Sequence, residues 1–151
     1  MSVEKFRECI YNQHDVVCNQ KYAETLPYST HLGFVEAQGK KFMNLLPNKH
    51  CINEGNYRDR EVSYGEIVTY ALISHDSIED ARMTYSDLLD VINTESLGNA
   101  KAAMMIADIV YCVTDEKGKS RKDRKNYKYY EGLKGNKLAV FVKLADLAAN
   151  T

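Results

Sequence analysis

The feature that most constrains the fold is an apolar segment that runs directly into a cluster of acids, YALISHDSIED at positions 70–80. Ser63 followed by Glu66 has the pattern of a helix-capping box. We therefore expect a helix to begin at Tyr64 and to continue to about Asp80. The apolar residues before the acids indicate that this helix is substantially buried.

Similar periodic patterns predict further helices, and no segment shows the sustained alternation that is typical of a strand. The sequence therefore indicates one all-α domain over residues 1–151. The further expected helices are 3–19, 31–46, 84–92, 97–113 and 136–147.

The helix expected from His31 to Leu46 has Ser29 or Thr30 as its predicted cap. Its expected inner face consists of Leu32, Val35, Phe42, Leu45 and Leu46. The polar residues 48–61 after it are expected to form a surface loop.

The charge balance excludes a global positive field, because 20 basic and 21 acidic residues give a formal net charge of -1. Extended nucleic-acid binding is therefore not expected. No apolar run is long enough to span a bilayer, and the N-terminal residues do not resemble a signal peptide. The four cysteines form no CxxC pair, which favours buried or incidental thiols in a reducing cytoplasm.

The acids after the apolar run are closely spaced on the predicted helix. His75 and Glu79 share one helix face, and Asp76 and Asp80 share the next. Carboxylates this close repel one another unless a cation neutralises them or they face water. A cation site and a solvated helix end therefore both remain open interpretations.

Two distant residues bear on that choice. His31 lies at a predicted helix start, where a histidine is either a cap, a core residue or a ligand. Asp146 lies within the apolar run LAVFVKLADLAA (138–149). A carboxylate there needs a strong partner, which is either the nearby Lys143 or a cation.

In chain order these residues read H…HD…D, which resembles the metal-binding pattern of the HD-domain phosphohydrolases. Within that superfamily the chain is more similar to the Rel/Spo-type and small alarmone hydrolases, which remove the 3′-pyrophosphate of (p)ppGpp. The likeness runs from about Tyr22 to the C-terminus. The segments that carry it are PYSTH (27–31), ALISHDSIEDARMTYSDL (71–88), IADIVYCVTDEKG (106–118) and VKLADLAAN (142–150).

The resemblance implies a single HD-domain helical bundle with a metal site between its helices. Mn²⁺ is the ion that the family implies, and two imidazoles with two carboxylates suit a borderline divalent cation. By position the implied metal ligands are His31, His75, Asp76 and Asp146. Glu79 and Asp80 match the acids that orient or activate water, and Asn150 matches an asparagine that contacts the nucleotide.

The chain departs from the alarmone hydrolases in front of the first histidine, where the family carries an Arg-Lys pair. Here those positions hold Tyr22 and Ala23, with Lys21 just before. Basic residues that could take over phosphate binding are Lys21, Lys143, Arg121 and Arg124. The basic stretch that holds the two arginines, 117–128, is alternatively a solvated loop.

These observations predict a cytoplasmic enzyme that uses a divalent metal to hydrolyse a nucleotide phosphate or pyrophosphate ester. An alarmone 3′-pyrophosphohydrolase is the first expectation, and a nucleoside monophosphatase or other nucleotide phosphohydrolase is the second. A sensor that binds a nucleotide without turnover is the non-enzymatic alternative, and a purely structural helical module is a further one. The expected partner is a small nucleotide, and the sequence is compatible with a homo-oligomer.

Overall fold

The computed structural model describes residues 3–52, 59–93, 97–114 and 127–150, and most of them are helical, as the sequence predicts. The longer helices are α1 (Val3–Asn12), α2 (Ser29–Lys41), α3 (Tyr64–Ser74), α5 (Tyr85–Asn93), α6 (Ala100–Val113), α8 (Tyr127–Lys134) and α9 (Lys137–Ala149). The shorter elements are the π-helical turn η1 (Gln13–Val17), the 3-10 turn η2 (Met43–Leu45) and α4 (Ser77–Asp80). Two antiparallel pairs of two-residue strands complete the set: β1 (Lys21–Tyr22) with β2 (Leu26–Pro27), and β3 (His50–Cys51) with β4 (Val62–Ser63).

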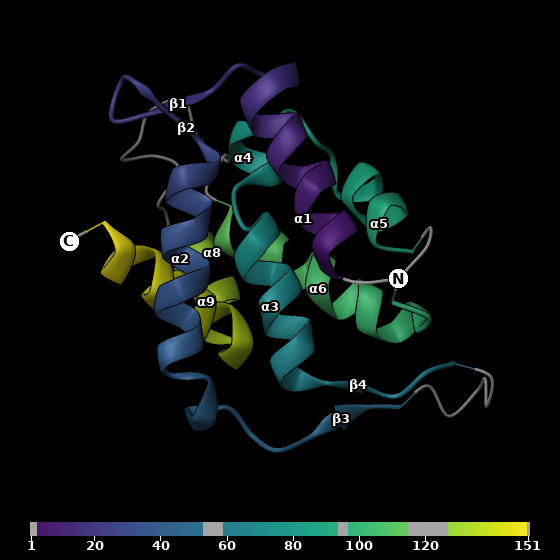
Figure 1. The fold of residues 1–151 in the computed structure, drawn as a ribbon. Helices are drawn as coiled ribbons and strands as arrows, with labels where there is room; N and C mark the ends of the chain where they lie inside the picture. Colours follow the sequence, from purple (N-terminus) through teal and green to yellow (C-terminus); the bar gives the residue numbers. More distant parts are fainter. Residues whose placement is uncertain (1–2, 53–58, 94–96, 115–126, 151) are drawn as a thin grey trace.

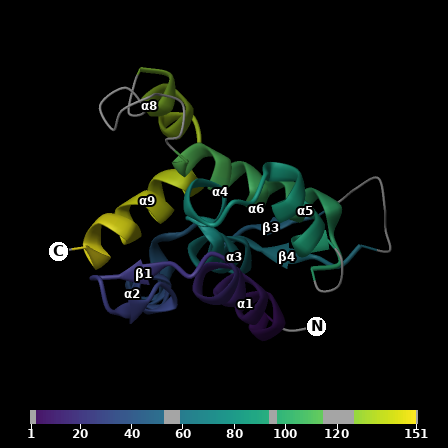
Figure 2. The same cartoon turned by 90° about the horizontal axis from the view of Figure 1, so that it is seen from above.

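Helix α3 lies at the centre of the molecule and packs against α1, α2, α6 and α9 (Figures 1 and 2). It begins where the capping box predicts, because the Glu66 backbone N–H donates to the Ser63 hydroxyl oxygen at 3.1 Å. Every residue from Tyr70 to Ser74 is buried. Burial of this kind is the main source of fold stability, and it fixes the end of α3 deep between its neighbours.

Helix α2 approaches α3 closely at Gly39. A Cβ atom built on Gly39 would lie 2.4 Å from Cδ1 of Leu72, so any larger residue here would require Leu72 to shift. Helix α2 also packs against α9, which runs beside it (Figure 1). The three helices α2, α3 and α9 therefore form one packed group.

Several predicted helix ends are wrong. The helix expected over 3–19 ends at Asn12, and the chain continues as a π turn in which the Cys18 N–H donates to the Gln13 carbonyl at 3.0 Å. Helix α2 has no side-chain cap from Ser29 or Thr30. Instead, the Ser29 N–H donates to the carboxylate of Asp15 at 2.9 Å. A partner fourteen residues away cannot be found by local capping rules.

The inner face expected for the helix over 31–46 is also partly wrong. Leu32 and Val35 are fully buried, but Phe42 and Leu45 are 51% and 72% exposed. The helix ends at Lys41, and the chain then turns through η2, so the periodicity no longer points these residues inward.

The loop expected over 48–61 is attached at both ends, and residues 53–58 lie outside the described part of the chain. Strand β3 pairs with β4, and Cys51 is buried. The Asn99 amide donates to the carbonyls of Cys51 and Arg60 at 3.2 and 2.8 Å, while its own oxygen caps α6. All four cysteines are free thiols. Among the described helices, none has the length and apolar character needed to cross a membrane.

Candidate metal centre

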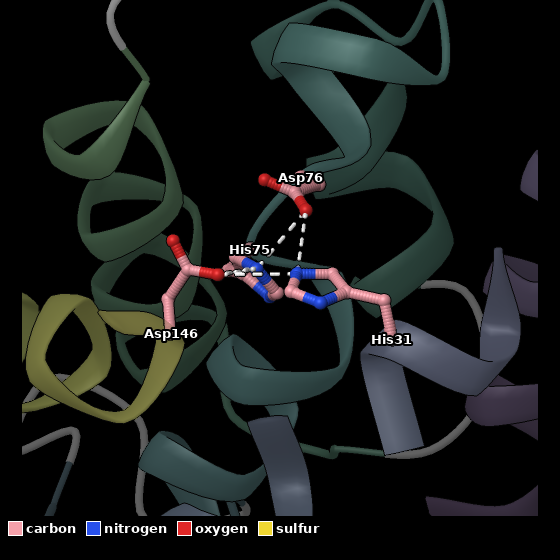
Figure 3. A group of neighbouring side chains, drawn as sticks. All are labelled: His31, His75, Asp76 and Asp146. Atoms are coloured by element: carbon pink, nitrogen blue, oxygen red, sulfur yellow. Dashed lines mark hydrogen bonds and ion pairs between the residues drawn. The ribbon is translucent and has the colours of Figure 1, made fainter. Parts of the chain in front are cut away.

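Two imidazoles and two carboxylates meet where α2, α3 and α9 come together (Figure 3). His31 lies in the first turn of α2, and Asp146 lies near the end of α9. His75 and Asp76 occupy the break between α3 and α4. One ligand-type atom from each of the four residues lies within 4.8 Å of all the others. The structure thus brings together the four residues that the sequence singles out as ligands.

The break after Ser74 differs from the continuous helix that the sequence predicts over 64–80. Asp76 has φ -98° and ψ 1°, outside the helical range, and α4 then begins at Ser77. The turn allows consecutive residues, His75 and Asp76, to direct side chains at one point. On an uninterrupted helix neighbouring side chains point about 100° apart.

The nitrogen and oxygen atoms of the four residues alternate around a closed ring. From His31 Nε2 the distances are 3.1 Å to Asp146 Oδ1 and 3.6 Å to Asp76 Oδ2. From His75 Nε2 they are 3.4 Å and 3.1 Å to the same two oxygens. Donors bound about 2.1 Å from one cation lie about 3.0–3.5 Å apart at octahedral or tetrahedral angles. The spacing of the four atoms therefore fits a single divalent ion.

The hydrogen bonding of His75 shows which of its nitrogens carries a lone pair. Its Nδ1 lies 2.9 Å from the Leu72 carbonyl oxygen, so Nδ1–H must be the donor. In the neutral ring Nε2 then holds a lone pair, and that atom is buried and without a hydrogen bond among the described residues. A lone pair facing two carboxylate oxygens is unfavourable unless a cation, either a proton or a metal ion, lies between them. A histidine that donates its second nitrogen to a backbone carbonyl is typical of metal ligands.

The pKa shifts of these residues also indicate that the group is stabilised by a bound positive charge. Burial lowers the pKa of His75, but Asp76 and Asp146 outweigh burial and raise that pKa to about 10. Burial raises the pKa of Asp146, but the neighbouring His31 and His75 outweigh burial and hold that pKa well below its usual value. The pKa of Asp76 is lowered against the effect of burial, chiefly by the charge of His75. Without a metal ion the group therefore holds a proton, which a metal would displace.

Tyr28 also belongs to this centre, although it is not among the site residues expected from the sequence. Its hydroxyl donates to Asp76 Oδ2 at 2.6 Å, the same oxygen that faces both histidines. Burial and the charge of Asp76 raise the pKa of Tyr28, so it stays protonated and remains a donor. Its position three residues before His31, on the same side of the chain, is the signal that could have identified it.

Glu79 and Asp80 lie beside the four ligand-type residues and are not part of their ring. Carboxylate oxygens of Asp76, Glu79 and Asp80 lie within 4.8 Å of one another. Glu79 also lines a cavity of about 10 Å³ with His75, Asp146 and Lys143. Asp80 is exposed. Glu79 is thus the better placed of the two to reach a water molecule at the centre.

A second, polar cavity of about 150 Å³ also adjoins the centre, and Asp76 and Asp146 line both cavities. Its lining includes Asn150, whose amide donates to the Asp146 carbonyl at 3.0 Å and also lies 3.3 Å from the Asp146 carboxylate. Tyr22 lies at the same cavity and packs on the His31 ring, with ring centroids 5.0 Å apart. Two aromatic rings and one amide therefore surround the open side of the metal group.

The basic residues predicted to bind phosphate have different positions. Lys143 Nζ lies 3.6 Å from Asp146 Oδ2, so it is within reach of the centre. Lys21 is exposed on β1 and lines neither of the two cavities at the centre. Arg121 and Arg124 lie outside the described residues.

The geometry thus brings together four residues that could hold a metal ion, a carboxylate beside them and a polar cavity. No protein-family model, curated protein or solved structure matches this chain.

Proposed function

We propose that this protein is a divalent-metal-dependent phosphohydrolase with the HD-domain architecture, acting on a nucleotide. The observation that carries the proposal is His75, whose Nδ1 is committed to a backbone carbonyl while Nε2 faces two carboxylate oxygens. Such an arrangement needs a cation, and the donor set suits Mn²⁺ or a similar ion. The cavity beside it offers room for a phosphate group.

A divalent ion bound here would make a water molecule more acidic and polarise a phosphoryl oxygen. The protein groups have separate tasks. Glu79 lines the centre and can accept a proton from the attacking water, and Asp80 can pass that proton to solvent because it is exposed. Tyr28 fixes the orientation of Asp76. Lys143 adds positive charge next to Asp146.

Two nucleotide classes fit the proposal. The resemblance to alarmone hydrolases places the 3′-pyrophosphate of guanosine 3′,5′-bis(diphosphate) first. A nucleoside monophosphate is the second candidate, and Tyr22 favours it. This aromatic residue lines the polar cavity at the position where alarmone hydrolases have an arginine. A site with less positive charge favours a substrate with fewer phosphates.

The deciding experiment measures products from a nucleotide panel with Mn²⁺, Mg²⁺, Fe²⁺, Co²⁺ or Zn²⁺. Release of pyrophosphate from guanosine 3′,5′-bis(diphosphate) supports the first class, and release of orthophosphate from a mononucleotide supports the second. Asp146→Asn should abolish either activity. Asp108→Asn is a matched control, because this exposed acid contacts Tyr85 on the surface and lies outside the centre.

Tight nucleotide binding without turnover in all five metals would contradict hydrolysis and indicate a nucleotide sensor. If the protein bound neither metal nor nucleotide, only a structural role would remain for the fold.

A further inference from the structure

A groove between α2 and α9 combines exposed apolar side chains with lysines. We call it the α2–α9 groove and define it by Phe42, Leu45, Phe141 and Leu144, which line a hollow of about 280 Å³. Leu45 and Phe141 also line an adjoining hollow of about 540 Å³, so the groove continues toward Lys49 and Lys137. The helices that form it lie side by side in Figure 1.

The apolar side chains of this groove are more exposed than side chains of their type usually are. Leu45 is 72% exposed, Leu144 is 59% exposed and Phe42 is 51% exposed. Phe42 and Leu45 lie in a periodic pattern that predicts burial in the core, yet the fold leaves them outside. Neighbouring exposed apolar residues that line a hollow are typical of an interaction surface.

The exposed charge along the groove segments is mostly positive. The two segments that line it, 38–49 and 135–148, contain five lysines and one acid, Asp146, in a chain whose net charge is -1. Two of these lysines have carboxylate partners on their own helices: Lys40 with Glu36 and Lys143 with Asp146. The remaining three are exposed and lie along the groove segments: Lys41, Lys49 and Lys137.

We propose that the α2–α9 groove binds an acidic amphipathic helix of a partner protein. The apolar side chains of such a helix, spaced at i, i+3 or i+4, and i+7, would fill the hollows, and its flanking Glu or Asp residues would meet the lysines. Complementary charge of this kind sets the choice of partner and the association rate. The proposal is independent of the activity proposed for the metal centre.

A second copy of this chain is a poorer occupant. A symmetric dimer through the groove would place the same surface on both subunits, so the exposed lysines of one subunit would be brought close to those of the other and would repel them. An anionic membrane fits less well because the groove is concave, with Gly39 and Ala145 in its lining, both of them buried. A flat bilayer cannot reach the bottom of such a hollow.

The test is a selection of peptides from a displayed random 16-residue library on the full-length protein. We expect enriched sequences to share the apolar helical spacing and an excess of acidic residues. A labelled synthetic peptide of the consensus should bind in fluorescence anisotropy. Leu45→Glu with Leu144→Glu should weaken binding by ~10-fold or more, and so should Lys41→Glu with Lys137→Glu. Because the replaced side chains are exposed, circular dichroism should show an intact fold.

Met104→Glu is the matched control, because Met104 is 52% exposed on α6 and does not line the groove. It should leave peptide binding unchanged. The proposal is overturned if no acidic consensus is enriched or if the groove variants bind as well as the wild type. It is also overturned if the groove variants abolish a dimer seen in sedimentation. If the wild type bound vesicles of phosphatidylserine and phosphatidylcholine and the groove variants did not, the groove would be a membrane-binding site and the proposal would be overturned.

Discussion

The contact between α2 and α3 at Gly39 gives a prediction whose magnitude can be worked from the structure. The Cβ of Gly39→Ala would lie 2.4 Å from Leu72 Cδ1 and 3.0 Å from Cδ2. Leu72 is fully buried, so it cannot move aside freely. Overpacking of this kind costs about 1–3 kcal/mol, while replacing a helical glycine by alanine gains about 0.5–1 kcal/mol. We expect Gly39→Ala to lower the free energy of unfolding by ~1–2 kcal/mol.

The same helix offers a matched control. In Gly33→Ala the nearest atom to the new Cβ is the Tyr11 hydroxyl oxygen, at 3.8 Å, which is ordinary contact. This variant should gain ~0.5–1 kcal/mol from helix propensity alone. Subtracting the change in unfolding free energy of Gly33→Ala from that of Gly39→Ala removes the contribution of helix propensity and leaves the cost of the clash with Leu72.

Urea denaturation of the two variants and the wild type measures the effect. A loss of about 1 kcal/mol corresponds to a decrease of about 2–4 °C in the midpoint of thermal unfolding for a chain of this size. Gly39→Ala should also weaken metal binding, because α2 holds His31 and α3 leads to His75. Equal stabilisation by both substitutions would refute the close packing inferred for Gly39.

Three further predictions concern the metal centre. Tyr28→Phe removes the hydrogen bond to Asp76 and should raise the metal dissociation constant ~10-fold or more, measured by calorimetry; an unchanged constant would exclude Tyr28 from orienting the ligand. Glu79→Gln should retain the metal but reduce turnover ~10²-fold or more, so an unchanged rate would remove Glu79 from proton transfer. In the metal-free protein the pKa of His75 is raised from 6.5 in the unfolded chain to about 10 in the folded one. Protonated His75 therefore stabilises the fold fully below pH 6.5, and this contribution is lost as the pH rises to about 10. Thermal unfolding with a chelator should therefore show a midpoint that decreases over that range, whereas a flat profile would contradict the proton held at His75.

The local patterns of the sequence predicted the helices well where the controlling contact is local. Ser63 caps α3, and Thr84 and Asp87 cap α5 by exchanging hydrogen bonds of 3.0 Å, as a capping box requires. These contacts span three residues, so the pattern of residue types contains all the necessary information.

The failures occur where a distant residue decides the structure. The carboxylate of Asp15 accepts a hydrogen bond from the first residue of α2, Ser29, although Asp15 is fourteen residues away. Phe42 and Leu45 are exposed because the chain turns after Lys41, and the hydrophobic periodicity does not reveal that turn. Strands β3 and β4 are fixed by their pairing with each other and by the hydrogen bond from Asn99 to Cys51, which no period-2 pattern can show.

For the site, the sequence identified the four residues that lie together, but not the helix break and the hydrogen bond that orient their side chains. The spacing of His75 and Asp76 implied adjacent positions on a continuous helix, whereas a break directs both at one point. The bond from Tyr28 to Asp76 joins residues 48 positions apart, so it became visible only in three dimensions.

The most direct test of the account is the binding of a divalent ion to the metal-free protein. Calorimetric titration with Mn²⁺, checked by elemental analysis, should give one ion per chain, with about one proton released as His75 gives up its second hydrogen. Asp146→Ala should bind no ion, while Asp108→Ala should bind like the wild type. An absence of stoichiometric metal in the wild type, or full retention of it in Asp146→Ala, would contradict the central claim.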